Sequence, residues 1–293
     1  MTKTAWVFPG QGSQAAGMGL DLLNIPAAKE RFAQAERILG WSVPQICGSQ
    51  EDKLSRTFYT QPCLYVVSTL LAELMLHRGN KPELLAGHSL GEYVALCTAG
   101  VFSFEVGLNL VKRRAELMDQ AAGGAMTALI GFDRQQLEAQ IKHIPDVVLA
   151  NDNHASQVVI SGTPAAIEAV LERVKVKRVI PLNVSGAFHS PLMATAAAEF
   201  QQVLEPIVFQ PAQIPVLSNV DPTPAIAADS LKQRLMEQMT GPVRWREISL
   251  QLASIGIEQV IEVGPGKVLT GLIKRTCPDI GLENVSSVAE ISA

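Results

Sequence analysis

The chain has 293 residues, of which 47% are hydrophobic and 18% charged, and its formal net charge is −4. This length is sufficient for one large or two modest domains, and the composition excludes an intrinsically disordered chain. The negative balance gives no electrostatic case for nucleic-acid binding, which needs a basic face.

The sequence carries no sign of a membrane or secretory segment. No uncharged apolar run reaches about 18 residues, and the best candidate, which starts at Cys63, is interrupted by Glu73. The N-terminus reads as a strand rather than a signal peptide, so we expect a cytoplasmic protein without membrane contact. The four cysteines show no CxxC or metal-like spacing and are expected to be reduced thiols.

The first part of the chain alternates apolar strands with helices. Thr4–Phe8 reads as a strand that runs into the turn Gly10-Gln11-Gly12. A long helix is expected to open at Thr60-Gln61-Pro62, because proline fits a first helical turn, and to end at Gly79. The further expectations are an amphipathic helix at 27–39, a strand at 84–87, a helix at about 90–99 and a helix from a Ser103 cap to about 121.

The pattern changes after Gly123-Gly124, where a small βαββαβ unit is expected. Its strands are expected at 126–131, 147–150, 157–161 and 178–184, and its helices at 133–143 and from 163. The polar stretch NDNHAS, residues 151–156, is expected to be a loop. This order is the split unit of ferredoxin-like folds, so we predict a ferredoxin-like small subdomain over 125–189, inserted into a large subdomain formed by 1–124 and 190–293.

The remaining chain returns to alternating elements. The expected elements are a helix from about 192, a strand at 214–218, a helix ending at Met239, another helix and a buried strand at 259–263. Strands that alternate with helices favour a largely parallel sheet. The fold class is therefore predicted to be α/β, with a mostly parallel core sheet.

One short stretch carries a recognisable chemical motif. Gly87-His88-Ser89-Leu90-Gly91 matches G-x-S-x-G between an expected strand and an expected helix, which is the context of a nucleophile elbow. The turn would lift the Ser89 hydroxyl above the sheet, and the backbone N–H of Leu90 would face a developing oxyanion.

A serine nucleophile needs a base, and the chain has five histidines. His77 and His143 lie at the ends of expected helices, and His88 should point away from its neighbour Ser89. His154 stays open as a base. His189 is favoured, because it lies where the chain returns from the inserted unit to the main domain.

Arg114 interrupts the apolar face of its expected helix. Positions three, four and seven residues away on that face are apolar or small, namely Gly107, Leu110, Val111 and Met118. A buried guanidinium requires an anionic partner. The residues alone favour an internal ion pair with an Asp or Glu, and the functional alternative is a clamp on a substrate carboxylate.

Two glycine-rich stretches resemble phosphate-binding motifs. Residues 10–15 satisfy G-x-G-x-x-A after a strand, but an amphipathic helix stands where a dinucleotide fold needs a second strand ending in an acid. Residues 264–267, Gly-Pro-Gly-Lys, lack phosphate-loop spacing, and a structural turn explains them. Nucleotide binding is therefore not favoured.

Taken together, five stretches resemble one family. They are FPGQGSQ at 8–14, GHSLGEY at 87–93, VKRRAELM at 111–118, GAFHSPLM at 186–193 and EVGPGKVLTGL at 262–272. The chain resembles the malonyl-CoA:acyl carrier protein transacylases of fatty acid synthesis, relatives of the acyltransferase domains of polyketide synthases. The resemblance runs from about residue 4 to 275 and implies an α/β-hydrolase-like core with a ferredoxin-like insertion.

The resemblance implies a role for each matching residue. Ser89 would be the nucleophile and His189 its base. Arg114 would bind the malonyl carboxylate, and the backbone N–H groups of Gln11 and Leu90 would form the oxyanion hole. No metal or bound cofactor is implied.

Two further positions are implied to orient the histidine and to select the acyl group. In the family a backbone carbonyl holds the second histidine nitrogen, and the matching position is Gln238, although Thr240-Gly241 after it fits less closely. Phe188 matches the residue that marks malonyl selectivity, since its ring would crowd a methyl branch. Without the resemblance, Asp152 is the only tempting loop candidate for a triad acid.

The implied reaction is ping-pong transfer of malonyl from malonyl-CoA to the phosphopantetheine thiol of acyl carrier protein, by a protein expected to be a monomer. A free-standing acyltransferase for polyketide synthesis is the nearest alternative, and a serine thioesterase or hydrolase is a more distant one. The carrier is expected to be acidic, whereas this chain is net negative. Docking would therefore need a local basic patch, which the sequence does not locate.

Overall fold

The computed structural model describes residues 2–49 and 52–291. A five-stranded sheet forms its centre, in the order β7-β2-β1-β8-β9, and its strand pairs are all parallel. These strands are β1 (Thr4–Phe8), β2 (Leu84–Gly87), β7 (Val216–Leu217), β8 (Gln259–Val263) and β9 (Gly281–Val285).

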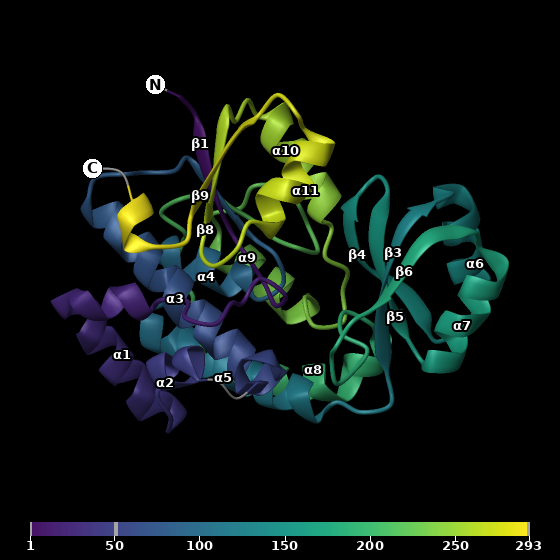
Figure 1. Ribbon diagram of the computed structural model, residues 1–293, viewed down its shortest axis with the longest axis horizontal. Helices are drawn as coiled ribbons and strands as arrows, with labels where there is room; N and C mark the ends of the chain where they lie inside the picture. The colour runs from purple at the N-terminus through teal and green to yellow at the C-terminus, as the bar shows by residue number, and fades with distance from the viewer. Residues whose placement is uncertain (1, 50–51, 292–293) are drawn as a thin grey trace.

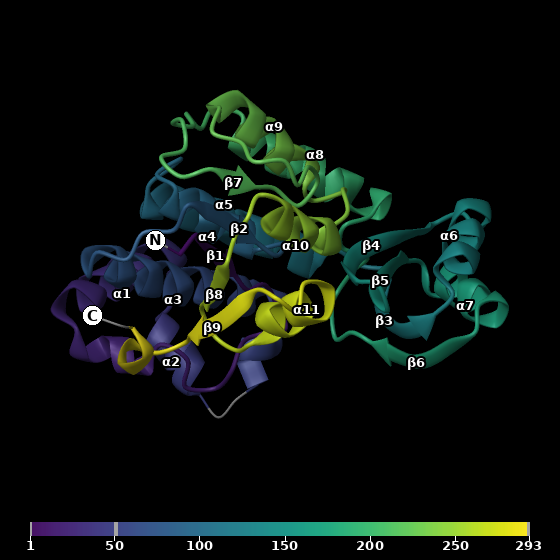
Figure 2. The same cartoon turned by 90° about the horizontal axis from the view of Figure 1, so that it is seen from above.

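Helices cover both faces of this sheet (Figures 1 and 2). Alternate residues of β1 explain the layers: Trp6 and Phe8 pack into the larger core with the helices of the first part of the chain, whereas Ala5 and Val7 pack against the helices near the C-terminus. The helices of the large core are α1 (Pro26–Leu39), α2 (Val43–Gly48), α3 (Thr57–His77), α4 (Gly91–Thr98), α5 (Phe104–Gln120), α8 (Ala194–Leu204) and α9 (Ala228–Glu237). Those on the opposite face are α10 (Trp245–Ser254) and α11 (Val268–Thr276).

A second sheet, drawn in teal in Figure 1, lies to one side of the first. It is antiparallel, in the order β4-β5-β3-β6, and α6 (Arg134–His143) and α7 (Pro164–Arg173) pack on it around a separate apolar core. Its strands are β3 (Ala125–Phe132), β4 (Val147–His154), β5 (Gln157–Gly162) and β6 (Val176–Pro181). The predicted α/β class with a small antiparallel unit is confirmed, and the subdomain limits at 124 and 190 stay a prediction.

Several predicted boundaries are wrong. The stretch at 151–154 is not a loop: it continues β4, because these residues pair with β5 across two register shifts and Asn151 bridges to Val243 of the main domain. Helix α3 begins at Thr57, three residues before the predicted opening, and contains Pro62.

Two edge strands and the return strand of the small sheet also differ from prediction. β6 ends at Pro181 rather than 184, and β7 has only two residues. The half-buried strand β9 had no prediction, because its sequence GLENV carries no apolar alternation. Within residues 2–49 and 52–291, no helix combines the length and apolar character needed to cross a membrane.

Candidate active site

The nucleophile elbow predicted at Ser89 is built by close backbone packing. Ser89 has φ 52°, in the left-handed region, between the end of β2 and the start of α4. A Cβ at Gly91 would lie 2.0 Å from the carbonyl oxygen of Phe8, so a side chain there is excluded. Ser89 keeps this strained backbone conformation because the closely packed backbone around the turn excludes other conformations.

The glycine turn after β1 lies directly against this elbow. The backbone N–H of His88 donates to the Phe8 carbonyl at 3.0 Å, and a Cβ at Gly10 would lie 2.4 Å from the carbonyl oxygen of His88. Gln11 follows, and its side chain donates to the Thr57 hydroxyl at 3.0 Å. The structure thus brings Gln11 and the elbow to one place.

His189 faces the serine with its ring held in one orientation. Its Nε2 lies 2.8 Å from Ser89 Oγ, while Nδ1 lies 2.9 Å from the carbonyl oxygen of Gln238 and 3.1 Å from that of Gly241. Because carbonyl oxygens only accept, Nδ1 carries the proton and Nε2 is left to accept one from Ser89. Burial, together with the charge of Arg114, lowers the pKa of His189 to about 3, which keeps the ring neutral.

Arg114 also reaches the serine. Its guanidinium is fully buried and donates through Nη1 to Gln61 Oε1 at 2.7 Å, and through Nη2 to Ser89 Oγ at 2.9 Å and Gln238 Oε1 at 3.1 Å. Nε has no hydrogen-bond partner within the described chain, and the group lies 5.4 Å from the centre of the Tyr93 ring.

The expectation of an internal ion pair at Arg114 is therefore wrong. In the described part of the chain, no Asp or Glu oxygen forms a salt bridge with it. Burial lowers the pKa of Arg114, and the nearby Tyr93 and Glu92 oppose that shift. The side chain is a buried cation whose partners are neutral acceptors.

A cavity of about 70 Å³ surrounds these groups between the two sheets. Phe188, which is 5% exposed, contributes to its wall. The other lining residues are Gln11, Gln61, His88, Ser89, Leu90, Arg114, Met118, Met126, Asn151, Leu182, Val184 and His189. Six of the seven predicted site residues line this cavity. The seventh, Gln238, contacts Arg114 through its side chain and His189 through its backbone carbonyl.

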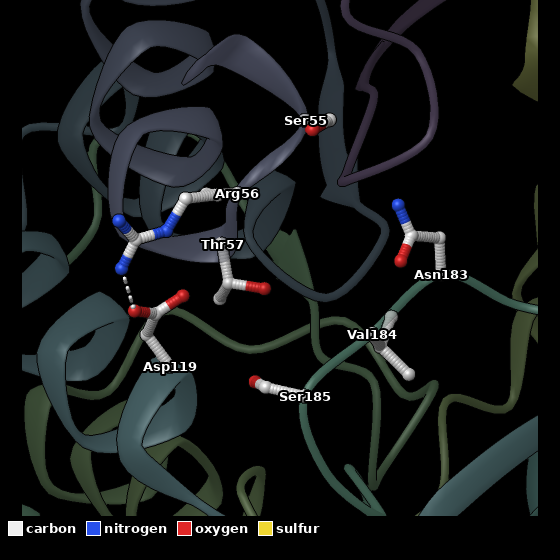
Figure 3. Close-up of a pocket in the computed structure, with 7 residues that line it drawn as sticks. All are labelled: Ser55, Arg56, Thr57, Asp119, Asn183, Val184 and Ser185. Carbon is white, nitrogen blue, oxygen red and sulfur yellow. Dashed lines mark hydrogen bonds and ion pairs between the residues drawn. The ribbon is translucent and has the colours of Figure 1, made fainter. Parts of the chain in front are cut away.

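A second, more open pocket of about 310 Å³ shares Val184 with this cavity. Figure 3 shows Thr57, Asn183 and Ser185 around it, with Arg56 bonded to Asp119 at 2.9 Å. Because Thr57 also holds the Gln11 side chain, the open pocket adjoins the turn beside the elbow.

The alternative base and acid are occupied elsewhere. His154 lies in β4, where its ring contacts Gln157 and the backbone of Ser156. Asp152 accepts from Arg134 and Arg246. Neither reaches the serine, so the structure favours His189.

Three polar residues of the site were missed by the sequence analysis: Gln61, Glu92 and Asn219. Glu92 stands inside the quoted stretch GHSLGEY and is fully buried, a rare state for a carboxylate. Asn219 accepts from the backbone N–H of Ser89 at 2.7 Å. Of the three, only Glu92, the acid beside the elbow motif, could have been found from the sequence.

The described residues include no cluster of three or more His, Cys, Asp or Glu that could hold a metal ion.

This α/β fold, with an elbow serine against a buried histidine and arginine, suits an acyltransferase. The chain belongs to the acyl transferase domain family, which it matches over residues 5–291.

Relatives of known name cover almost the whole chain. It is 55% identical over 291 residues to a malonyl CoA-acyl carrier protein transacylase of Synechocystis sp., covering 99% of both chains. A crystal structure of the Synechocystis transacylase superimposes with a TM-score of 0.97 at 56% identity, over 99% of both chains. A malonyl-transacylase solved in complex with a type II polyketide synthase acyl-carrier protein gives a TM-score of 0.92 at 38% identity, over 99% of this chain and 98% of that one.

Proposed function

We propose that the protein transfers the malonyl group of malonyl-CoA to the phosphopantetheine thiol of acyl carrier protein, through a malonyl-Ser89 intermediate. One observation carries the substrate class: Arg114 is a buried cation 2.9 Å from the Ser89 hydroxyl, and among the described residues no carboxylate pairs with it. In a malonyl ester the free carboxylate stands three bonds from the serine oxygen, within reach of this guanidinium.

In the first half-reaction, Nε2 of His189 accepts the hydroxyl proton while Ser89 Oγ bonds to the thioester carbon. The oxyanion is stabilised by the backbone N–H groups of Gln11 and Leu90, neither of which donates to another group within the described chain. The carbon–sulfur bond then breaks, and coenzyme A leaves with the proton from His189.

In the second half-reaction, the carrier's thiol gives its proton to His189 and attacks the malonyl ester. Ser89 regains the proton as its bond to the acyl carbon breaks. Arg114 holds the malonyl carboxylate throughout and so fixes the ester carbonyl for the incoming thiol. The neutral ring of His189 suits both proton transfers.

We favour fatty acid synthesis as the pathway that receives the malonyl groups. The relative at 55% identity is named for malonyl transfer without a polyketide qualifier, whereas relatives named for polyketide biosynthesis are 42% to 45% identical. A monomeric, cytoplasmic enzyme is part of the proposal, and sedimentation of the purified protein tests the monomer.

Intact-protein mass spectrometry tests the central intermediate. The protein is exposed to malonyl-CoA, and we expect a malonyl adduct that persists in water and is discharged by an acyl carrier protein. The Ser89→Ala variant should form no adduct. Rapid loss of the adduct in water alone would favour a hydrolase, and stoichiometric labelling of the variant would exclude Ser89 as nucleophile.

A further inference from the structure

We propose that Glu92 is a positioning residue for malonyl selectivity, acting through the side-chain amide of Gln238 on Arg114. The inference rests on the proposed function, because it concerns how the arginine is prepared for a malonyl carboxylate. Glu92 lies in the second position of α4, directly behind the elbow, and its side chain does not reach the substrate cavity.

The contacts of Glu92 are few and directed. Its Oε2 accepts from Gln238 Nε2 at 2.7 Å and from the backbone N–H of Asn219 at 3.2 Å. Burial raises the pKa of Glu92, and these donors, the nearby Ser218 hydroxyl and the charge of Arg114 oppose that rise. The side chain is fully buried. A buried carboxylate requires donors, so the Gln238 amide must present its nitrogen to Glu92.

This contact decides which end of the Gln238 amide faces Arg114. With Nε2 bonded to Glu92 and to the Ser89 carbonyl at 2.9 Å, Oε1 is turned to Arg114 Nη2 at 3.1 Å. If the amide were reversed, two donors would meet at Arg114 and an acceptor would meet the carboxylate. Glu92 therefore fixes the acceptor that aims the guanidinium.

A second branch reaches the elbow. Asn219, held through its backbone N–H by Glu92, accepts from the Ser89 N–H at 2.7 Å and donates to the Gly87 carbonyl at 2.6 Å. These two bonds span the strained turn. Disturbing Glu92 is thus expected to slow acylation by any acyl group, and to slow malonyl additionally through Arg114.

The position of the Gln238 amide between Glu92 and Arg114 explains why Glu92 does not compete with the substrate carboxylate for the guanidinium. One neutral amide separates the carboxylate from the guanidinium, and these two described residues make no salt bridge with each other. A carboxylate directly on Arg114 would occupy the donors that malonyl needs. Glu92 supplies an opposite charge nearby, whose attraction opposes the lowering of the Arg114 pKa by burial, without filling the site.

Two conservative variants separate the position of the acceptor from its charge. Glu92→Gln keeps an oxygen that can accept from Gln238 and removes the charge, whereas Glu92→Asp keeps the charge and draws the oxygens back by one methylene. The measurement is kcat/KM for acylation of Ser89 by malonyl-CoA and by acetyl-CoA. We expect Glu92→Asp to lower the malonyl-to-acetyl ratio about tenfold, and Glu92→Gln to keep it within about threefold of wild type.

The double variant Glu92→Gln/Gln238→Glu exchanges the two groups and retains the composition of the pair. It places the carboxylate directly on Arg114, so we expect the ratio to fall about tenfold or more. This variant keeps a donor–acceptor match between the two side chains, and the bond that it removes, from residue 238 to the Ser89 carbonyl, is lost for both acyl groups alike. It therefore provides a test even where Glu92→Asp fails to fold.

A matched control is available in β8. Glu262 is also fully buried and accepts from the backbone N–H groups of Leu269 and Thr270 at the start of α11, away from the cavity. Glu262→Gln and Glu262→Asp should alter thermal stability without changing the malonyl-to-acetyl ratio.

The outcomes are distinguishable. An unchanged malonyl-to-acetyl ratio in Glu92→Asp or in the exchanged pair would overturn the inference. A ratio that falls equally in Glu92→Gln and Glu92→Asp would also overturn it. A wild-type protein that does not accept malonyl in preference to acetyl would instead overturn the proposed function.

Discussion

Arg114 Nη2 lies 2.9 Å from the Oγ of Ser89, so the buried cation and the elbow hydroxyl form one unit before any substrate is present. Arg114 lies on α5, and Ser89 lies in the turn between β2 and α4. In the proposed malonyl-enzyme, this arrangement would hold the acyl carboxylate beside the ester carbonyl.

Replacing Arg114 tests this relationship. We expect Arg114→Ala to lower kcat/KM for malonyl-CoA at least about 100-fold, because the malonyl carboxylate would be buried without a partner, and to lower acetyl transfer far less. The matched control is Arg113→Ala, since Arg113 pairs on the surface with Glu116 and Glu199. Equal losses for both acyl groups would mean that Arg114 is only structural.

The pH dependence of acylation follows from the lowered pKa of His189. The base acts in its neutral form, and a pKa of about 3 keeps it neutral throughout the range from about pH 5 to 8. We expect kcat/KM for malonyl-CoA to vary less than about threefold between pH 5 and 8. A sigmoidal decrease of kcat/KM as the pH is lowered, with a midpoint near pH 6.5, would contradict this assignment.

The same shift affects folding stability with a definite sign. His189 has a pKa of about 3 in the folded chain against an ordinary value of 6.5, so below pH 6.5 the unfolded chain binds a proton that the folded chain does not. Stability should therefore decrease as the pH falls from 6.5 toward 3, by about 2 kcal/mol at pH 5 from this residue. Burial lowers the pKa of His88 too, which adds a loss of the same sign.

Urea unfolding at pH 7 and pH 5 measures this loss. The His189→Asn variant should lose less free energy of unfolding between the two pH values than the wild type. An identical loss in both proteins would show that His189 does not titrate differently on unfolding.

Phe188 provides a prediction on the acyl branch. Its buried ring lines the cavity beside Ser89, where a methyl branch would need room. We expect Phe188→Leu to raise the ratio of methylmalonyl to malonyl transfer about tenfold, which is within the range of one methyl group in an apolar pocket. Competition between the two CoA esters, read by mass spectrometry, measures the ratio; an unchanged ratio would exclude Phe188 as the selecting residue.

Much of the fold and site was predictable, because the signals were local. The elbow at Ser89 depends on glycines that allow backbone to approach backbone, and these are visible in five consecutive residues. The burial of Arg114 followed from helical periodicity within α5. The continuation of β4 through His154 was not predictable, because its polar residues are held by pairing with β5 and by a bridge to Val243.

By itself, the sequence determined the elbow serine, the buried arginine and the alternation of strands and helices that makes an α/β core. Only the tertiary structure decided the partners. It placed Gln238 between Glu92 and Arg114, gave His189 two backbone carbonyls instead of an acid, and left Arg114 without a carboxylate partner in the part of the chain that the structure describes. The physical reason is distance along the chain: these contacts join residues 49 to 146 positions apart, and no local propensity specifies which polar atoms meet when the elements pack.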